Sequence, residues 1–583
     1  MIPSWIIGLT DPVLKADFES FSGAGSITEA EIGEALTGLA AEDEKSGATL
    51  SASQFADLQL MASNIGAMGA SPYLQSITDA LVYGDAANAT WTGGGSKSVK
   101  LGNLAVGSTT TQLGELIDKW FYGADLPIDK VVMTGYASVT VTYSAVDAPL
   151  FGPDGPKMSD INQGYLGDCY LLASLAEVAK KNPSAITSMI TDNNNGTYGV
   201  RFYVDGIARY VTVNNELADG GTEFNSATNI WASVVETAFA EVQDQGLITG
   251  NGKYNKGNSF SSIANGGVSA NALEAITDAT EITNFAAKDS NLTWTAHVYD
   301  QALTQIKHHA GLSTAEVLST VAADLLIGDD VDLNSAKNAR FANGKRTLID
   351  DHVMSIFGYD ALTGKLQIRN PWGVESGQNW ATTFQIKLRT LLADGDSITV
   401  DNVGTATSVQ GASVVASSAL QNMAQVASFS VTDSVADIYA GFPQVISDSK
   451  LTSLTAIGTT GGDTLDLIGL DVPATINMEG NTDAASMSGG VLHLGSGFDS
   501  IALGFRHATV DYSLNGGGVE FVADFNAIHD LLSISLSGGS LQQTFVDGGD
   551  WISSSTDMSH GVFLANVTSA QKVTVSHGIA TVV

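Results

Sequence analysis

The stretch Gln163-Gly-Tyr-Leu-Gly-Asp-Cys-Tyr-Leu-Leu-Ala-Ser-Leu175 contains Cys169, the only cysteine of the 583-residue chain. Its two glycines predict a loop, and the apolar run after Cys169 predicts a helix that begins there. A thiol at a helix N-terminus lies at the positive end of the helix dipole, which favours the thiolate. The backbone N–H of Cys169 would be free to bind an oxyanion, with the Gln163 amide as a second donor. Cys169 is therefore a candidate nucleophile.

A nucleophilic thiol needs an imidazole as its base and a group that orients the ring. His352 opens the strand-like run His352–Tyr359, and Asn370 follows the next such run, Leu366–Arg369. A hairpin of this length would return Asn370 to His352, with Trp372 shielding the pair from water. Taken alone, a free cysteine is usually a small buried hydrophobic residue, and a strand-end histidine is usually structural. Together the three residues follow the Cys-His-Asn order of papain-like enzymes.

The surrounding sequence predicts a mixed fold. Leu171–Lys180 and Trp231–Val242 have helical patterns, whereas Thr197–Val204 and Ile207–Val213 alternate and are joined by Asp205-Gly206, a strong hairpin signal. Helices followed by an antiparallel sheet indicate an α+β domain. Three further histidines lie in a polar, helix-like stretch and are expected at the surface: His297, His308 and His309.

Four segments then show a specific resemblance. Asp160-Ile-Asn-Gln-Gly-Tyr-Leu-Gly-Asp-Cys-Tyr170 resembles the nucleophile motif of the calpain family, Asp-Ile-x-Gln-Gly-x-Leu-Gly-Asp-Cys-Trp. The His352 strand with Asn370-Pro-Trp-Gly373 is similar to the second catalytic motif. Residues 196–206 and 231–240 are similar to the family's hairpin and its Trp-x-x-x-x-Glu-x-Ala helix, and Gly266-Gly267 to the start of its second lobe. The resemblance covers roughly residues 150–400.

This resemblance implies a two-lobed, papain-like cysteine endopeptidase that acts on a protein or peptide substrate. It implies the nucleophile at Cys169, the general base and acid at His352, and the orienting amide at Asn370. Gln163 would donate to the oxyanion, and Trp372 would cover the His–Asn contact. Two departures stand out: Tyr170 replaces a tryptophan, and Asn214-Asn215 replaces two acids. The second departure weakens the expectation that the core itself responds to calcium.

The flanking regions differ from the core in composition. Residues 1–125 contain no arginine and have helical periodicity, which predicts a helical accessory domain. Residues 126–149 predict a connecting strand region, with alternation from Val131 to Tyr143. The core would divide into a lobe over 150–265 with Cys169 and a lobe over 266–400. Residues 401–583 contain short strand-like runs separated by glycine pairs, and predict an all-β region. The fold class is thus multidomain.

Three C-terminal stretches resemble degenerate copies of the Gly/Asp calcium nonapeptide of RTX proteins: Gly461–Asp466, Leu494–Ile501 and Ala523–Leu532. The third also resembles a stretch of proteins exported by bacterial type I secretion machinery. Calcium prefers carboxylate and carbonyl oxygens, so the candidate ligands are Asp463, Asp466, Asp499 and Asp530. The alternative is an ordinary β-sandwich with Gly-Asp turns.

The charge composition limits the kinds of partner that the chain is expected to bind. The chain has 26 Lys+Arg against 62 Asp+Glu, a formal net charge of −36. A chain this acidic repels nucleic acid and anionic membranes, so neither is expected as a partner. No apolar run is long enough to span a membrane, and a single cysteine excludes an intramolecular disulfide. The N-terminus lacks a typical secretory signal. We expect no organic cofactor.

These features leave three functions open. The first is a secreted or cell-surface bacterial endopeptidase, exported without a classical signal, although a cytoplasmic location is not excluded. The second is a secreted calcium-binding adhesin or surface protein in which the calpain-like module is a non-catalytic scaffold. The third is an acyltransferase that uses the same Cys-His-Asn chemistry. The complete set of catalytic residue types, in order, favours the first.

Overall fold

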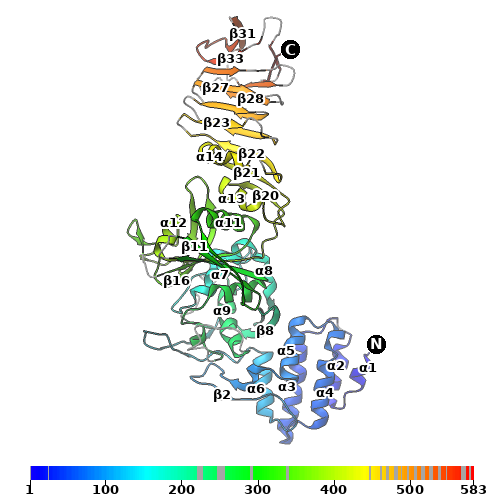
Figure 1. Cartoon of the computed structure of the whole chain (residues 1–583). Coiled ribbons are helices and arrows are strands. Elements are labelled where there is room, and N and C mark those ends of the chain that lie inside the picture. Colours follow the sequence, from blue (N-terminus) through cyan, green and yellow to red (C-terminus); the bar gives the residue numbers. More distant parts are fainter. Residues whose placement is uncertain are drawn as a thin grey trace. The chain divides into compact units, whose positions relative to one another are not determined.

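The computed structural model of the chain divides into two compact units (Figure 1). The first unit contains Met1–Leu312, Asp329–Phe357 and Gln367–Val403, and the second contains Ser313–Gly328, Gly358–Leu366 and Gly404–Val583. The structure describes residues 2–23, 25–219, 228–245, 257–288, 293–336, 340–445, 448–459, 462–467, 470, 472–477, 483–487, 489–494, 498–503, 508–513, 519–523, 525, 530–535, 540–546, 548–565, 567, 573–576 and 579–582.

The N-terminal region is helical, as its sequence predicts. Its helices are α1 (Ser4–Ile7), α2 (Pro12–Phe21), α3 (Glu29–Ser46), α4 (Ala52–Ala62), α5 (Pro72–Val82) and α6 (Thr110–Trp120). Each helix from α2 to α6 is preceded by a Ser, Thr or Asp whose side chain accepts backbone N–H groups of the first turn. Their apolar faces form one buried core. No helix in the described part of the chain is long and apolar enough to cross a membrane.

A helical lobe follows, built around α7 (Cys169–Lys181), α8 (Pro183–Met189) and α9 (Trp231–Glu241). Every residue of α7 from Cys169 to Ala179 is buried, so this helix lies in the lobe's core. The strands β6 (Ile190–Asp192), β7 (Thr197–Val204) and β8 (Ile207–Asn214) form an antiparallel sheet. Asp205 and Gly206 both have positive φ, which confirms the predicted two-residue hairpin turn.

A second lobe is built on an eight-stranded sheet. The helix α10 (Ser269–Thr277) packs against α7. The strand order is β12 (Gln305–Leu312), β11 (Thr293–Asp300), β10 (Glu281–Lys288), β19 (Ser397–Asp401), β13 (Val331–Ser335), β16 (His352–Asp360), β17 (Lys365–Arg369) and β18 (Thr383–Ile386).

Two predictions for this part of the chain are wrong. His297, His308 and His309 lie in strands β11 and β12 and not in a helix, because Trp294, Ala296 and Val298 form one buried side of a strand pair. The predicted strand over residues 131–143 is broken into pieces. Only β3 (Lys130–Val131), β4 (Val139–Thr140) and β5 (Tyr143–Ala145) form there.

The helical region docks on the β7–β8 hairpin. The Tyr73 hydroxyl lies 2.8 Å from Thr212 Oγ1, and Asn195 donates to Glu29 at 2.9 Å. Lys119 of α6 is buried and lies 2.5 Å from Asp125. The buried contact between Tyr73 and Thr212 fixes where the hairpin meets the helices.

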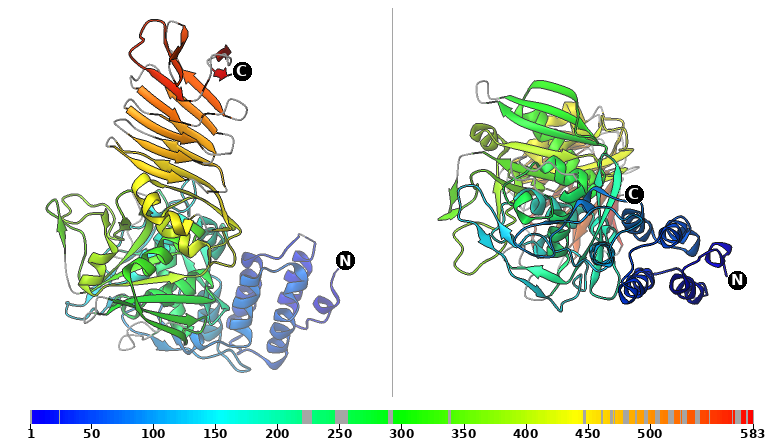
Figure 2. Two further views of the ribbon diagram at one scale, coloured as in Figure 1. Left: turned by 45° about the horizontal axis from the view of Figure 1, so that its top comes forward. Right: turned by 90° about the horizontal axis from the view of Figure 1, so that it is seen from below.

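The second unit is strand-rich but not all-β. It contains α11 (Thr314–Ile327), α13 (Val414–Leu420) and α14 (Val435–Val445) before a long run of short strands. From β22 (Leu451–Ile457) to β30 (Leu531–Ser535), successive strands alternate between two sheets, and neighbours within each sheet are parallel (Figure 2). This parallel coil excludes the ordinary antiparallel β-sandwich.

The coil is held in register by repeated inward-facing side chains. Leu465 pairs with Ala485, and Ala485 pairs with Ile501, so this column of their sheet is apolar. All three side chains are buried in the unit's core. The short, alternating strand patterns of the sequence arise because each strand buries one face and exposes the other.

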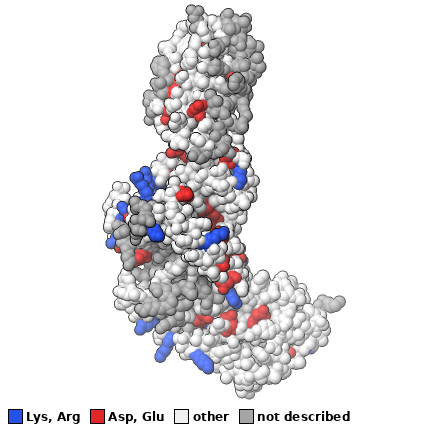
Figure 3. All heavy atoms as spheres, viewed as in Figure 1, with Lys and Arg blue, Asp and Glu red and all other residues white. Residues whose placement is uncertain are grey.

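Only part of the chain's excess of acidic residues lies on the surface. On the face shown in Figure 3, the described Lys and Arg side chains are scattered and do not merge into a continuous basic patch. Many acids lie inside the molecule: Asp168, Glu177, Asp330 and Asp332 are all completely buried. Buried acids therefore need an explanation in terms of protons or partners.

Candidate active site

The Cys169 loop is fixed by backbone contacts. The N–H groups of Leu171 and Leu172 donate to the Asp168 carbonyl at 2.9 and 3.2 Å, so the helix begins at the cysteine. Gly167 exchanges hydrogen bonds with Ala264 and Gly266 of the neighbouring loop. A Cβ at Gly167 would lie 2.4 Å from the Ala264 carbonyl oxygen, so only glycine fits there. Cys169 itself is 7% exposed.

His352 and Asn370 form a buried pair at adjacent strand ends. His352 Nε2 lies 2.9 Å from Asn370 Oδ1, and the same oxygen accepts the Trp372 N–H at 3.0 Å. Because Asn370 Oδ1 is an acceptor, Nε2 carries the imidazole proton and Nδ1 is the free base. The Trp372 ring centroid lies 5.0 Å from that of His352 and covers the contact.

The histidine strand lies directly against the cysteine helix. The Val353 N–H donates to Cys169 Sγ at 3.4 Å, and Ser355 Oγ donates to the Ala173 carbonyl at 2.8 Å. Val353 follows His352 in the chain. The structure therefore brings Cys169, His352 and Asn370 to one buried site at the contact of α7 with β16.

Comparison with known proteins finds a family match that spans this site. Residues 142–389 match the family described as Calpain family cysteine protease. The chain carries a calpain-family cysteine protease domain. A curated relative, calpain clp-4 of Caenorhabditis elegans, is 27% identical over 251 residues, which cover 39% of this chain and 29% of the relative. The matched part thus spans less than a third of that relative's length.

Within the calpain-family domain, Gln163 lies at the site but faces its own loop. Its backbone N–H donates to the Pro371 carbonyl at 2.8 Å, which ties the nucleophile loop to the Asn-Pro-Trp-Gly turn. Its side-chain nitrogen donates to the Leu166 carbonyl at 2.7 Å and contacts Asp168 Oδ1 at 3.3 Å. One of these contacts must give way before the amide serves an oxyanion.

Burial controls the charge of the Cys–His pair. It raises the pKa of Cys169 to about 12. The N–H groups of Tyr170 at the helix start and of Val353 act to lower this pKa, whereas the Asp168 carboxyl acts to raise it. Burial also lowers the pKa of His352 to about 4. Both groups are therefore neutral at pH 7 in this conformation. The predicted thiolate is wrong for this conformation, because the cost of burying the charge exceeds the effect of the helix dipole.

Asp168 meets a second acid beneath the nucleophile. It is completely buried, and Glu236 of α9 is 3% exposed beside it. Burial and the Glu236 carboxyl raise the pKa of Asp168 well above its ordinary value. A proton shared by the two carboxyl groups removes the charge repulsion beneath Cys169.

Other residues that fix the site were missed by sequence reasoning. The buried Arg369 donates to the Ile161 carbonyl at 2.7 Å, and Asn162 Oδ1 accepts the Val374 N–H at 3.3 Å. Gly373 has φ +66°, and a Cβ there would lie 1.8 Å from Asn162 Oδ1. The sequence signal for the close approach of Asn162 to Gly373 is the glycine itself, which directly follows Trp372 in the Asn-Pro-Trp-Gly motif.

The C-terminal acids do not gather at one point. Asp463 directly precedes β23 (Thr464–Leu467), and Asp466 lies in that strand. Asp499 lies in β27 (Phe498–Leu503), and Asp530 directly precedes β30. Among the described residues, no group of three His, Cys, Asp or Glu side chains is arranged to hold a metal ion. Much of the three RTX-like stretches lies outside the described residues: Gly461, Gly495–Gly497, Asp524 and 526–529.

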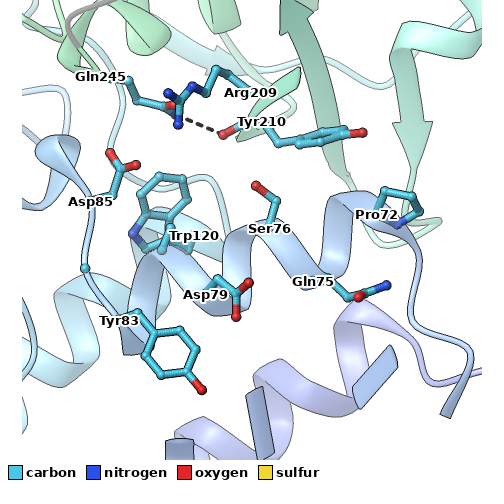
Figure 4. Close-up of a pocket in the computed structure, with 12 residues that line it drawn as sticks. Pro72, Gln75, Ser76, Asp79, Tyr83, Asp85, Trp120, Arg209, Tyr210 and Gln245 are labelled. Carbon is cyan, nitrogen blue, oxygen red and sulfur yellow. Dashed lines mark hydrogen bonds between the residues drawn. The ribbon is translucent and has the colours of Figure 1, made fainter. Parts of the chain in front are cut away.

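A separate hollow of about 670 Å³ lies where the helical region meets the hairpin (Figure 4). Its lining includes Asp79 from α5, Trp120 from α6, and Arg209 and Tyr210 from β8. Gln245 donates to the Tyr210 carbonyl at 3.0 Å at its edge. The hollow marks the junction between the two parts and is not the Cys169 site.

Proposed function

We propose that this chain is a cysteine endopeptidase that hydrolyses peptide bonds through an acyl-enzyme on Cys169. The observation that carries the proposal is the 2.9 Å contact between His352 Nε2 and Asn370 Oδ1, on a strand that also contacts Cys169 Sγ. This arrangement leaves Nδ1 of His352 as the acceptor of the thiol proton. A cysteine, a histidine and an orienting amide are the parts that thiol acyl transfer requires.

The reaction would start from the neutral pair. As Cys169 Sγ attacks the peptide carbonyl carbon, its proton moves to His352 Nδ1, so charge forms only as the bond forms. The Cys169 N–H and the Gln163 amide would stabilise the oxyanion. His352 then protonates the leaving amine, and afterwards takes a proton from the water that releases the acyl group. Asn370 holds the Nε2 proton throughout, while Trp372 keeps water from that contact.

Casein cleavage by the full chain and by Cys169→Ala tests this proposal, with Glu19→Gln, which alters an exposed carboxyl on α2, as the control. Cleavage by wild type and control but not by Cys169→Ala would support it. A folded wild-type protein that cleaves nothing, and whose Cys169 resists a thiol-reactive peptide probe, would instead favour the scaffold of an adhesin. Transfer of the acyl group to an added amine in preference to water would favour the acyltransferase.

We also propose that calcium acts in the C-terminal coil and takes no part in the reaction steps. Support comes from acids that stack between successive coils: the Asp463 N–H donates to Asp483 at 2.7 Å, and the Asp483 N–H donates to Asp499 at 3.0 Å. A carboxyl oxygen of the buried Asp483 has no hydrogen-bond partner in the described part of the chain. A hard cation prefers such oxygens.

A further inference from the structure

Four carboxyl groups that take no part in the proposed reaction are buried together in the protease domain. Glu177 belongs to α7, Asp330 directly precedes β13, Asp332 lies in β13, and Asp401 lies in β19. Their exposed fractions are 0%, 0%, 0% and 3%. Both carboxyl oxygens of Glu177 and both of Asp330 lack a hydrogen-bond partner among the residues that the structure describes. Four unscreened negative charges buried together would be strongly destabilising.

The charges around this acid cluster do not balance it. Lys181 and Lys180 of α7 act on Glu177 and favour its ionised form, whereas Asp329 next to β13 adds a further negative charge. The α10 side contributes the uncharged Thr277 hydroxyl, which lies 3.2 Å from Asp401 and 2.7 Å from the Leu273 carbonyl oxygen. Cys169 of α7 is also near enough for Asp332 to disfavour its thiolate. Burial and mutual repulsion therefore raise the pKa of all four acids above the ordinary value.

The hydrogen bonds of Ser174 indicate where one such proton lies. Ser174 Oγ is 2.9 Å from the Tyr170 carbonyl and 2.5 Å from Asp332 Oδ2. A hydroxyl group has one hydrogen, and the carbonyl can only accept it. The hydroxyl therefore cannot donate to both acceptors at once, and a proton on Asp332 would satisfy both contacts. Burial raises the pKa of Asp332 to about 8, even though the hydrogen bond from Ser174 acts to lower it.

This contact joins the two sides of the active site. Ser174 is five residues after Cys169 on α7, and Asp332 pairs with Ser355 of the strand that begins with His352. Ser355 Oγ in turn donates to the Ala173 carbonyl of α7. A negative charge on Asp332 would face Glu177 across the same α7–β13 contact and push these elements apart.

We propose that Asp332 is a positioning residue that holds a proton, and that loss of this proton to solvent separates Cys169 from His352. The acid cluster then acts as a built-in alkaline off-switch for the enzyme. This regulation rests on the proposed function, but the protonated contact itself does not. It requires only that α7 and β13 stay together while Asp332 is neutral.

The direction of the pH effect follows from linkage. Asp332 binds its proton more tightly in the folded state than in the unfolded state, where an aspartate has its ordinary pKa near 3.8. The stability that this proton contributes is therefore complete at acidic pH and is lost as the pH rises through about 8. One pH unit above its pKa, the ionised form exceeds the protonated form about tenfold.

Asp332→Asn in the full chain tests the inference, because its amide keeps a donor for Ser174 but does not ionise. Urea unfolding, followed by tryptophan fluorescence from pH 5 to 9, should show that wild type loses stability at the alkaline end and the variant much less. The peptidase kcat/KM of the variant should equal that of wild type at pH 6 and exceed it about tenfold at pH 9. Glu19→Gln should follow wild type.

Identical alkaline behaviour of Asp332→Asn and wild type would overturn the inference. Because unfolding is measured without turnover, a protein that lacks peptidase activity still tests the proton, and the two proposals fail separately. If Asp332→Asn does not fold, Ser174→Ala replaces it and should move the alkaline loss of stability to lower pH; no movement would overturn the inference. If a chelator destabilises wild type at pH 7 but not Asp332→Asn, a bound cation and not a proton neutralises the cluster.

Discussion

His352 shows how burial alone sets the working form of a catalytic base. The ring is 5% exposed and its pKa is lowered to about 4, so it stays neutral well below the usual pH range of histidine titration. The folded state gains stability from the neutral ring above the ordinary histidine pKa and loses it as the pH falls through about 4. The base is therefore available in mildly acidic solution.

We expect the acid limb of kcat/KM to fall near pH 4, because that limb reports the base of the free enzyme. A pH series with a fluorogenic peptide measures it, with unfolding followed in the same buffers. An acid limb near pH 6.5 in a protein that is still folded would show that His352 is solvated in the active conformation.

Gly373 is a position at which a side chain is excluded twice. Asn162 leaves no room for a Cβ there, and the backbone has a positive φ. Gly373→Ala should destabilise the protein more than Gly377→Ala. Gly377 also has positive φ, but nothing lies within 4 Å of its added Cβ. The backbone alone costs roughly 1–2 kcal/mol at each position. The excess at Gly373, measured by urea unfolding, reports the contact with Asn162, and equal losses would mean that Asn162 moves aside freely.

At the scale of elements, buried ion pairs determine how the helical region meets the protease domain. Lys119 of α6 is 8% exposed and lies 2.5 Å from Asp125 and 3.5 Å from Asp244. Two carboxylates thus share one buried cation. Removing that cation leaves both acids uncompensated in the same place, which is worse than losing an exposed pair.

Lys119→Met should therefore lower the free energy of unfolding by about 3–5 kcal/mol. Lys45→Met, which removes an exposed lysine paired with Glu42, is the matched control and should change little. Thermal or urea unfolding compares the two. A loss of the same size in both variants would mean that the junction does not depend on the buried pair.

Elements with a strong local signal could be predicted, and those set by distant partners could not. The α7 helix and the Asp205-Gly206 turn follow from apolar periodicity and turn chemistry, which are local. The strands around His297 and His308 were missed, because their partner side chains are polar and their pairing is decided by the sheet. The same holds for the acid cluster: Glu177 and Asp332 are far apart in the chain, and only the fold buries them together.

At the scale of the whole molecule, the catalytic motifs were readable because they are short and contiguous. The sequence indicated calcium, but the four aspartates chosen from it do not form one site among the described residues. It also predicted an all-β region without its parallel coil. Short strands with Gly-rich turns are common to sandwiches and coils, so local patterns do not distinguish them.

Calcium should raise the thermal midpoint of the C-terminal unit in the full chain, because a cation neutralises acids that stack between coils. Calorimetry with calcium, magnesium or a chelator measures the shift, and Asp483→Asn should reduce it. Glu19→Gln, on a different unit, should leave the shift intact. A midpoint that is the same in calcium and in chelator would remove calcium from the coil.

The parallel pairing of the coil has one more consequence. Each turn of the coil contacts only the turn before it and the turn after it, so stability accumulates along one direction, as in other solenoids. Such a stack has no fixed length, because a complete turn can be gained or lost without changing the pairing of the other turns. We expect natural variants of this chain to differ in the number of turns by whole units, since a partial turn would place Leu465 and its successors on the wrong face.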